Sequence, residues 1–165
     1  MRHTVLPGAV FVAMALLASV TAQAADTAIE LHGKGVQVYA CTQADTGFAW
    51  HLTGPDALLT DAAGRVVGHH FAGPSWQAKD GSTIVGESLV SSAAPKPGAV
   101  PWLVLRVKSH SGSGALASVA YVVRSHTVGG VAPATGCDQA HAGAESRVPY
   151  TATYTFFPGA ESPAK

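Results

Sequence analysis

The clearest structural signal in this sequence is the segment VPYTATYTFF, which runs from Val148 to Phe157. Apolar and polar residues alternate along it, and one parity holds Tyr150, Ala152, Tyr154 and Phe156. Successive side chains of a β-strand point to opposite faces of the sheet, so this alternation predicts a strand with one face toward a core. The threonines of the other parity would then face solvent.

The same period of two recurs in short segments through most of the chain, with breaks at Gly, Pro and Asp. Asp80-Gly81 is the sharpest break, because both residues tolerate the backbone conformation of a tight hairpin turn. We therefore expect a single all-β domain, an antiparallel β-sandwich or barrel of about eight to ten short strands. Its expected core includes Trp50, Leu103, Leu105, Val119, Tyr121, Tyr154 and Phe156.

Two longer segments do not show this alternation. Ser91 to Pro101 contains three prolines, which remove the backbone donors that a central strand requires, and it is expected to be a crossing connection. Gly129 to Arg147 is rich in Gly and Ala and has no clear period. Loops of this length in compact domains are usually functional, disordered or tethered.

The N-terminal residues have the form of a signal peptide. Arg2 and His3 precede an apolar run from Ala9 to Ala18, and Ala22-Gln23-Ala24 has the small-x-small form that signal peptidase accepts. We expect cleavage after Ala24 and export to the periplasm or the cell exterior. No later stretch approaches the roughly 18 consecutive apolar residues of a membrane span. The expected parts are a signal peptide (1–24), a β domain (25–157) and a disordered tail (158–165).

The charge balance excludes some classes of partner. Ten basic residues offset ten acidic ones, whereas nucleic-acid-binding surfaces are strongly basic, so no nucleic-acid partner is expected. Charged residues make up 12% of the chain and hydrophobic residues 47%, a composition that can bury a core and differs from that of disordered chains.

Cys41 and Cys137 are the only cysteines. An even number of cysteines in an exported protein favours one disulfide over two free thiols. The alternative is a metal-binding or catalytic thiol pair, but neither residue belongs to a CxxC motif.

Several segments form a distinctive combination. In chain order they are Gly35–Cys41, His70–Trp76 with Asp80–Ser82 behind it, Pro101–Leu103, Gly129–Pro133 leading to Gly136-Cys137, and Val148–Tyr150. Together they resemble DUF3455, a bacterial and fungal family of exported proteins of unknown function. The resemblance implies an exported single domain and supports pairing of the two cysteines. It implies no activity.

Histidine is the one unusual feature of the composition, with seven residues after the expected cleavage site. Imidazole suits zinc and copper, but no HxH or HExxH spacing is present, and the adjacent His69 and His70 would point to opposite faces of a strand. No GxSxG motif indicates a hydrolase. We therefore expect no metal and no cofactor, and the catalytic residues of any enzyme are not identified.

The most distinctive local segment is the block from His70 to Trp76. Aromatic walls with a few polar groups commonly hold small ligands, and glycines permit close approach of the backbone. The expected pocket is therefore built from His70, Phe71, Trp76, Gly129 and Gly130. The alternative is that Gly73-Pro74 is only a corner and Trp76 only a core residue.

These observations predict non-catalytic binding of a small molecule or a protein. The alternative is a secreted hydrolase or a metal-dependent enzyme that uses His70 and neighbouring residues.

Overall fold

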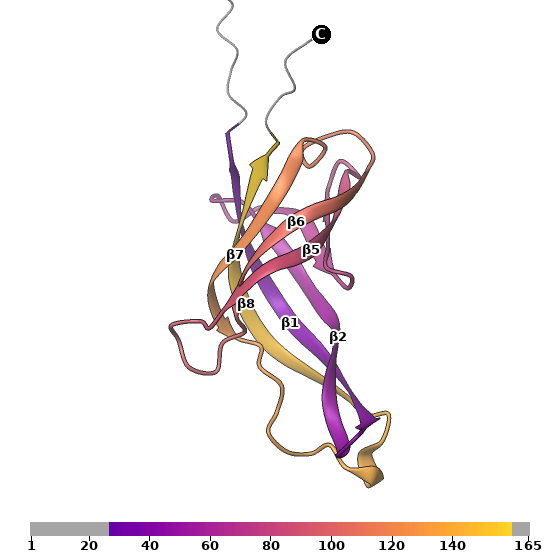
Figure 1. Cartoon of the computed structure of the whole chain (residues 1–165). Coiled ribbons are helices and arrows are strands. Elements are labelled where there is room, and N and C mark those ends of the chain that lie inside the picture. Colours follow the sequence, from indigo (N-terminus) through magenta and orange to yellow (C-terminus); the bar gives the residue numbers. More distant parts are fainter. Residues whose placement is uncertain (1–26, 160–165) are drawn as a thin grey trace, which may run out of the picture.

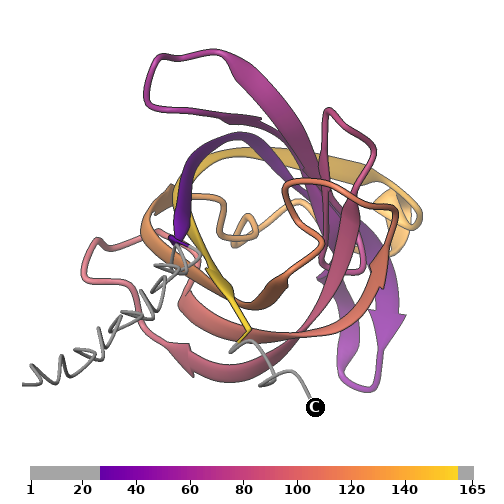
Figure 2. The same ribbon diagram turned by 90° about the horizontal axis from the view of Figure 1, so that it is seen from above.

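Eight β-strands take up most of residues 27–159, the part of the chain that the computed structural model describes. Each strand pairs antiparallel with the next one in sequence, and the last pairs with the first to close a barrel (Figure 1). Viewed from above, the strands encircle one interior (Figure 2). The strands are β1 (Ile29–Ala44), β2 (Gly47–Thr60), β3 (Val66–Phe71), β4 (Ser75–Ala78), β5 (Thr83–Ser92), β6 (Trp102–Ser111), β7 (Val119–Gly129) and β8 (Glu145–Pro158).

The prediction of an all-β fold is confirmed. Because the sheet closes on itself, the domain is a barrel and not a sandwich. The expected signal peptide and residues 160–165 of the expected tail lie outside the described residues, and β8 extends to Pro158. Within the described residues, no helix is long and apolar enough to cross a membrane.

The first two strands are longer than the alternation indicates. The alternation in segments 48–52 and 57–60 indicates two separate strands, but both segments belong to β2. Val38 of β1 pairs with Gly54 and the next residue, Tyr39, pairs with Leu52, so Thr53 is an extra residue in a β-bulge. A bulge bends a strand without ending it, and the sequence period therefore breaks while the strand continues.

Large aromatic side chains fill the barrel interior, and small residues on neighbouring strands make room for them. Trp76, Tyr154 and Phe156 are at most 1% exposed. A Cβ atom placed on Gly33 would lie 2.6 Å from the ring of Tyr154, and one on Gly86 would lie 3.0 Å from the ring of Trp76. Small barrels commonly match small residues to large ones in this way.

The expected core is confirmed for Leu105, Val119, Tyr154 and Phe156, which are buried, whereas Trp50 and Leu103 are half-buried. The prediction for Tyr121 was wrong, because its side chain is 45% exposed. The physical reason is a second bulge. Val119 pairs with Pro158 and Tyr121 with Phe157, so Ala120 is an extra residue that reverses the parity of β7 and turns Val122 inward.

The two connections without periodicity have different roles. The prediction of a crossing connection at Ser91 to Pro101 was wrong, because this segment joins the neighbouring strands β5 and β6. The long loop before β8 holds the short 3₁₀ helix η1 (Gln139–His141).

The disulfide joins this loop to β1. Cys41 is fully buried, and its Cα atom lies 5.3 Å from that of Cys137. The expected pairing is therefore confirmed, and the loop is tethered rather than free.

Threonine substitutions at two neighbouring positions test the bulge in β7. Val122→Thr places a hydroxyl group in the core and should lower the free energy of unfolding by about 1–3 kcal/mol. Tyr121→Thr places a β-branched residue on the outer face and should cost less than about 1 kcal/mol. Urea unfolding of both variants measures the difference, and a larger loss in Tyr121→Thr would show that the parity is misassigned.

Removal of the disulfide in the double variant Cys41→Ala/Cys137→Ala should destabilise the barrel. The two residues are separated by 96 positions. In the chain-entropy model, release of a loop of about 100 residues costs up to about 4.7 kcal/mol. Thermal unfolding should show a lower midpoint, while the control Ser111→Ala, at an exposed position, should match the wild type. An unchanged midpoint in the double variant contradicts a stabilising role.

Candidate functional site

His70 and Trp76 form the centre of the aromatic interior. They are directly opposite each other on β3 and β4, and their rings stack with centroids 4.5 Å apart and planes 6° apart. The edge of Tyr154 lies against His70, with ring centroids 4.9 Å apart. His70 is 2% exposed and Trp76 is 1% exposed. The two residues singled out in the sequence are therefore in contact, inside the barrel.

His70 is held as a neutral imidazole. Its Nδ1–H donates to the backbone carbonyl of Ser75 at 2.8 Å. Burial disfavours the charged ring and lowers the pKa of His70 to about 3, although the bond to Ser75 opposes this shift. Near neutral pH the ring is therefore an uncharged aromatic wall rather than a proton carrier.

The other three expected pocket residues lie elsewhere. Phe71 follows His70 on the opposite face of β3 and stacks on His69, with ring centroids 5.5 Å apart. The Gly130 carbonyl accepts a hydrogen bond from Tyr39 Oη at 2.6 Å, next to Gly129 at the end of β7.

Two tyrosines, Tyr150 and Tyr154, connect Gly130 to the aromatic centre. A Cβ atom on Gly130 would meet Cβ of Tyr150, whose hydroxyl lies 3.2 Å from that of Tyr154. Gly130 therefore belongs to the other half of the interior from the pocket described next.

An apolar pocket of about 240 Å³ opens at the end of the barrel where β1 begins and β8 ends, at the top of Figure 1. Gly68 and Ala78 line it, and the next inward positions on the same two strands are His70 and Trp76. The aromatic centre is therefore the layer directly below this pocket. The remaining lining residues are Ile29, Leu31, Leu59, Asp61, Val67, Ala115 and Leu116.

Sequence reasoning missed this pocket. The alternation is clear only from Val36 onward, whereas β1 begins at Ile29. The apolar alternation of Ile29 and Leu31 was the available signal, but Gly33 and Gly35 interrupt it. Leu116 follows a run of Ser and Gly that reads as a turn, so nothing in the sequence indicates that it is buried.

Asp61 is the one charged residue among the described residues that line the pocket. Its Oδ2 accepts a hydrogen bond from Arg65 Nε at 2.8 Å, and its Oδ1 accepts from the backbone amides of Ala63 and Arg65. The bond to the Arg65 side chain is the main reason that the pKa of Asp61 lies below its usual value. The carboxylate of Asp61 is thus already hydrogen-bonded at the rim of the pocket, and the walls of the pocket are aliphatic.

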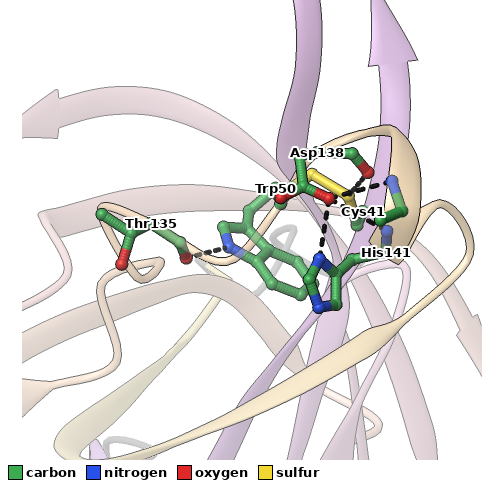
Figure 3. The surroundings of a disulfide bond; sticks show 7 residues. Cys41, Trp50, Thr135, Asp138 and His141 are labelled. Atoms are coloured by element: carbon green, nitrogen blue, oxygen red, sulfur yellow. Dashed lines mark hydrogen bonds and ion pairs between the residues drawn. A yellow bond between two sulfur atoms is a disulfide. The ribbon is translucent and has the colours of Figure 1, made fainter.

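A second groove lies at the opposite end of the barrel. It is beside the disulfide, whose surroundings are shown in Figure 3. Trp50 Nε1 donates to the carbonyl of Thr135 at 3.0 Å, which fastens the long loop to β2. Asp138 caps η1 by accepting from the amides of Ala140 and His141, and its carboxylate also lies 2.7 Å from His141 Nδ1. These polar groups are hydrogen-bonded to one another, so their role is to hold the long loop in place beside the disulfide.

Charged groups do not gather into a metal centre in the part of the chain that the structure describes, where no group of three or more His, Cys, Asp or Glu residues could hold an ion. The densest cluster is on the outer face. There Asp56 lies 3.0 Å from His69 Nε2 and also pairs with Arg147. The bond to His69 is the largest cause of the lowered pKa of Asp56.

Comparison with known proteins identifies a matching family. The sequence model of the family described as "Protein of unknown function (DUF3455)" matches residues 21–158. Neither the curated proteins nor the solved structures include a match.

Burial of a neutral His70 predicts a loss of stability in acid. Below pH 6.5 the unfolded chain binds a proton at this residue and the folded chain does not, until the pH approaches 3. The free energy of unfolding should therefore fall by up to about 1.4 kcal/mol per pH unit across this window. Urea unfolding at several pH values should show a shallower dependence in His70→Phe than in the wild type.

His51→Gln is the matched control, because His51 is exposed on β2. Its pH dependence should follow that of the wild type. Equal slopes in all three proteins would mean that His70 is charged or accessible in the folded state.

Proposed function

Because this chain belongs to the DUF3455 family, whose function is unknown, we propose from the geometry alone that it is a non-catalytic binding protein for a small apolar molecule. The proposed site is the pocket at the barrel mouth, between Leu31, Leu59 and Leu116.

The observation that carries this proposal is the aliphatic wall of the pocket. Ile, Leu, Val and Ala side chains form most of it, and the carboxylate of Asp61 is already bonded to Arg65. Water in such a cavity lacks hydrogen-bond partners, and dry apolar cavities of about 150 Å³ are known to bind benzene. A pocket of about 240 Å³ accommodates a larger apolar group.

The surrounding fold supports a preformed site. The mouths of β-barrels are among the preferred positions of small-molecule sites. Strands β1 to β4 provide most of the walls and are hydrogen-bonded to one another, while the buried stack of His70 and Trp76 supports the base of the pocket. Such walls keep their shape when the ligand is absent.

The arrangement of polar groups favours binding over catalysis. His70 was the residue expected to act in the alternative enzyme, but its ring is neutral and covered by Trp76 and Tyr154. A general base must come within hydrogen-bond reach of the proton that it removes. Neither ring nitrogen of His70 is among the groups that line the pocket at the mouth.

We place this binding outside the cytoplasm, in the periplasm or beyond the cell. The sequence pattern at residues 1–24 supports export, and the disulfide between Cys41 and Cys137 is of the kind that forms in oxidising compartments.

Titration with N-phenyl-1-naphthylamine, a neutral apolar fluorophore, tests the proposal. The wild-type protein should raise its fluorescence in a saturable way. Ala78→Leu adds apolar volume inside the pocket and should weaken binding at least tenfold, because the probe and the new side chain compete for one space. The variant should remain folded, since it fills space rather than removing contacts.

Ala49→Leu is the matched control, because Ala49 lines the groove beside the disulfide at the other end of the barrel. It should bind the probe as the wild type does. If Ala49→Leu abolishes binding and Ala78→Leu does not, the site is misplaced. If the wild type binds no probe, the proposed function is wrong.

A further inference from the structure

The loop between β6 and β7, Gly112–Ser118, covers the mouth of the barrel. Its residues Ala115 and Leu116 line the apolar pocket, and the side chain of Leu116 is 2% exposed. The loop begins with Gly112 and Gly114, both at positive φ, and its own backbone bonds, Ala117 to Gly114 and Val119 to Leu116, close turns within it. The loop is therefore a turn closed by its own backbone hydrogen bonds, and it places the apolar side chain of Leu116 against the pocket.

Two side chains of the β4–β5 turn hold this loop in place. Asp80 Oδ2 accepts a hydrogen bond from the amide of Ala115 at 2.8 Å, and Ser82 Oγ accepts one from the amide of Leu116 at 3.2 Å. Ser82 Oγ in turn donates to Asp80 Oδ1 at 2.6 Å. Both contacts therefore depend on one carboxylate.

The fit between loop and carboxylate is close. A Cβ atom on Gly114 would collide with the carboxylate of Asp80, so only glycine lets the loop approach this near. The amide of Ala115 is the largest cause of the lowered pKa of Asp80, which keeps the carboxylate charged and accepting. The remaining anchors lie at the base of the loop, where Gly159 N donates to the Ser118 carbonyl and His110 Nε2 lies 2.6 Å from the Val119 carbonyl.

A second pocket of about 240 Å³ lies on the other side of the same loop. Ile29 and Ala115 line both pockets. The remaining walls of the second pocket are Thr27, Gly114, Ser118, Val119, Phe156 and Pro158. The loop is thus the partition between two neighbouring spaces at one barrel mouth.

We infer that the β6–β7 loop is a lid latched by Asp80 and Ser82, and that its release joins the two pockets into one site for an apolar molecule larger than either. This inference rests on the proposed function, because it names the size of the ligand and its route of entry. A ligand held across both pockets must displace Ala115 and Leu116, which are the residues that the two latch contacts fix.

Asp80→Asn tests the latch with little change of shape. Its amide oxygen can still accept from Ser82, while its NH₂ group cannot accept from Ala115. Loss of a hydrogen bond to a charged group destabilises the closed position of the loop. The equilibrium constant for loop opening should therefore rise about tenfold or more. Amide exchange at Ala115 and Leu116 should accelerate by that factor, whereas exchange in β8 should not change.

Ser82→Ala is the second variant, and it should accelerate exchange at Leu116. Asp138→Asn is the matched control, because Asp138 caps a turn in the same way at the far end of the barrel. It should accelerate exchange at Ala140 and His141 and leave Ala115 unchanged. If Ala115 and Leu116 exchange only at the rate of the β8 core in both latch variants, the lid is refuted.

Binding kinetics test the joined site. The association rate constant of N-phenyl-1-naphthylamine should rise about tenfold in Asp80→Asn, a change that simple destabilisation would not produce. The longer apolar dye diphenylhexatriene should lose affinity in Ser118→Leu, which narrows the second pocket, while the smaller probe should not. Equal effects on both dyes would overturn the joined site.

The two proposals fail in distinguishable ways. Faster exchange at Ala115 and Leu116 with no dye bound by any variant would support the lid and refute the apolar ligand. Dye binding that is lost in Ala78→Leu but unaffected in rate by Asp80→Asn would support the ligand and refute the lid.

Discussion

Pairing of β8 with β1 is the interaction on which the rest of this structure depends. It joins the two ends of the chain's sheet, so each strand has two neighbours and all inward side chains share one interior. Closure also requires close fit, because Tyr154 of β8 occupies the space that a side chain at Gly33 of β1 would need. A sandwich would have left two edge strands on each of its two sheets and placed these residues between separate sheets.

Closure around large aromatic rings leaves unfilled space at the mouth. Trp76, His70 and Tyr154 fill the middle of the barrel, and the next positions toward the mouth are the small residues Gly68 and Ala78. Aliphatic side chains surround the remaining volume, and Leu116 covers it from the loop above. The pocket is therefore a consequence of where large and small residues alternate along β3 and β4, rather than of a cluster of polar groups.

The candidate site shows how far local sequence can be taken. The block from His70 to Trp76 was expected to place His70, Phe71 and Trp76 in one pocket. The hairpin of β3 and β4 stacks His70 on Trp76, whereas Phe71 lies on the opposite face of β3. Gly129 and Gly130 were grouped with them because glycines permit close approach of the backbone, but these glycines lie in the other half of the barrel interior. Which end of a strand meets which loop depends on the path of the whole chain, and no local pattern carries that information.

The sequence by itself determined what depends on neighbours in the chain or on composition: strands from alternation, a hairpin turn from Asp80-Gly81, and a disulfide from the only two cysteines. The tertiary structure alone decided closure, the inward position of Val122 in place of Tyr121, and the burial of Leu116 within a Ser- and Gly-rich turn. The reason is physical. Alternation is a property of one strand, whereas register, bulges and closure are set by hydrogen bonds and packing between strands far apart in sequence.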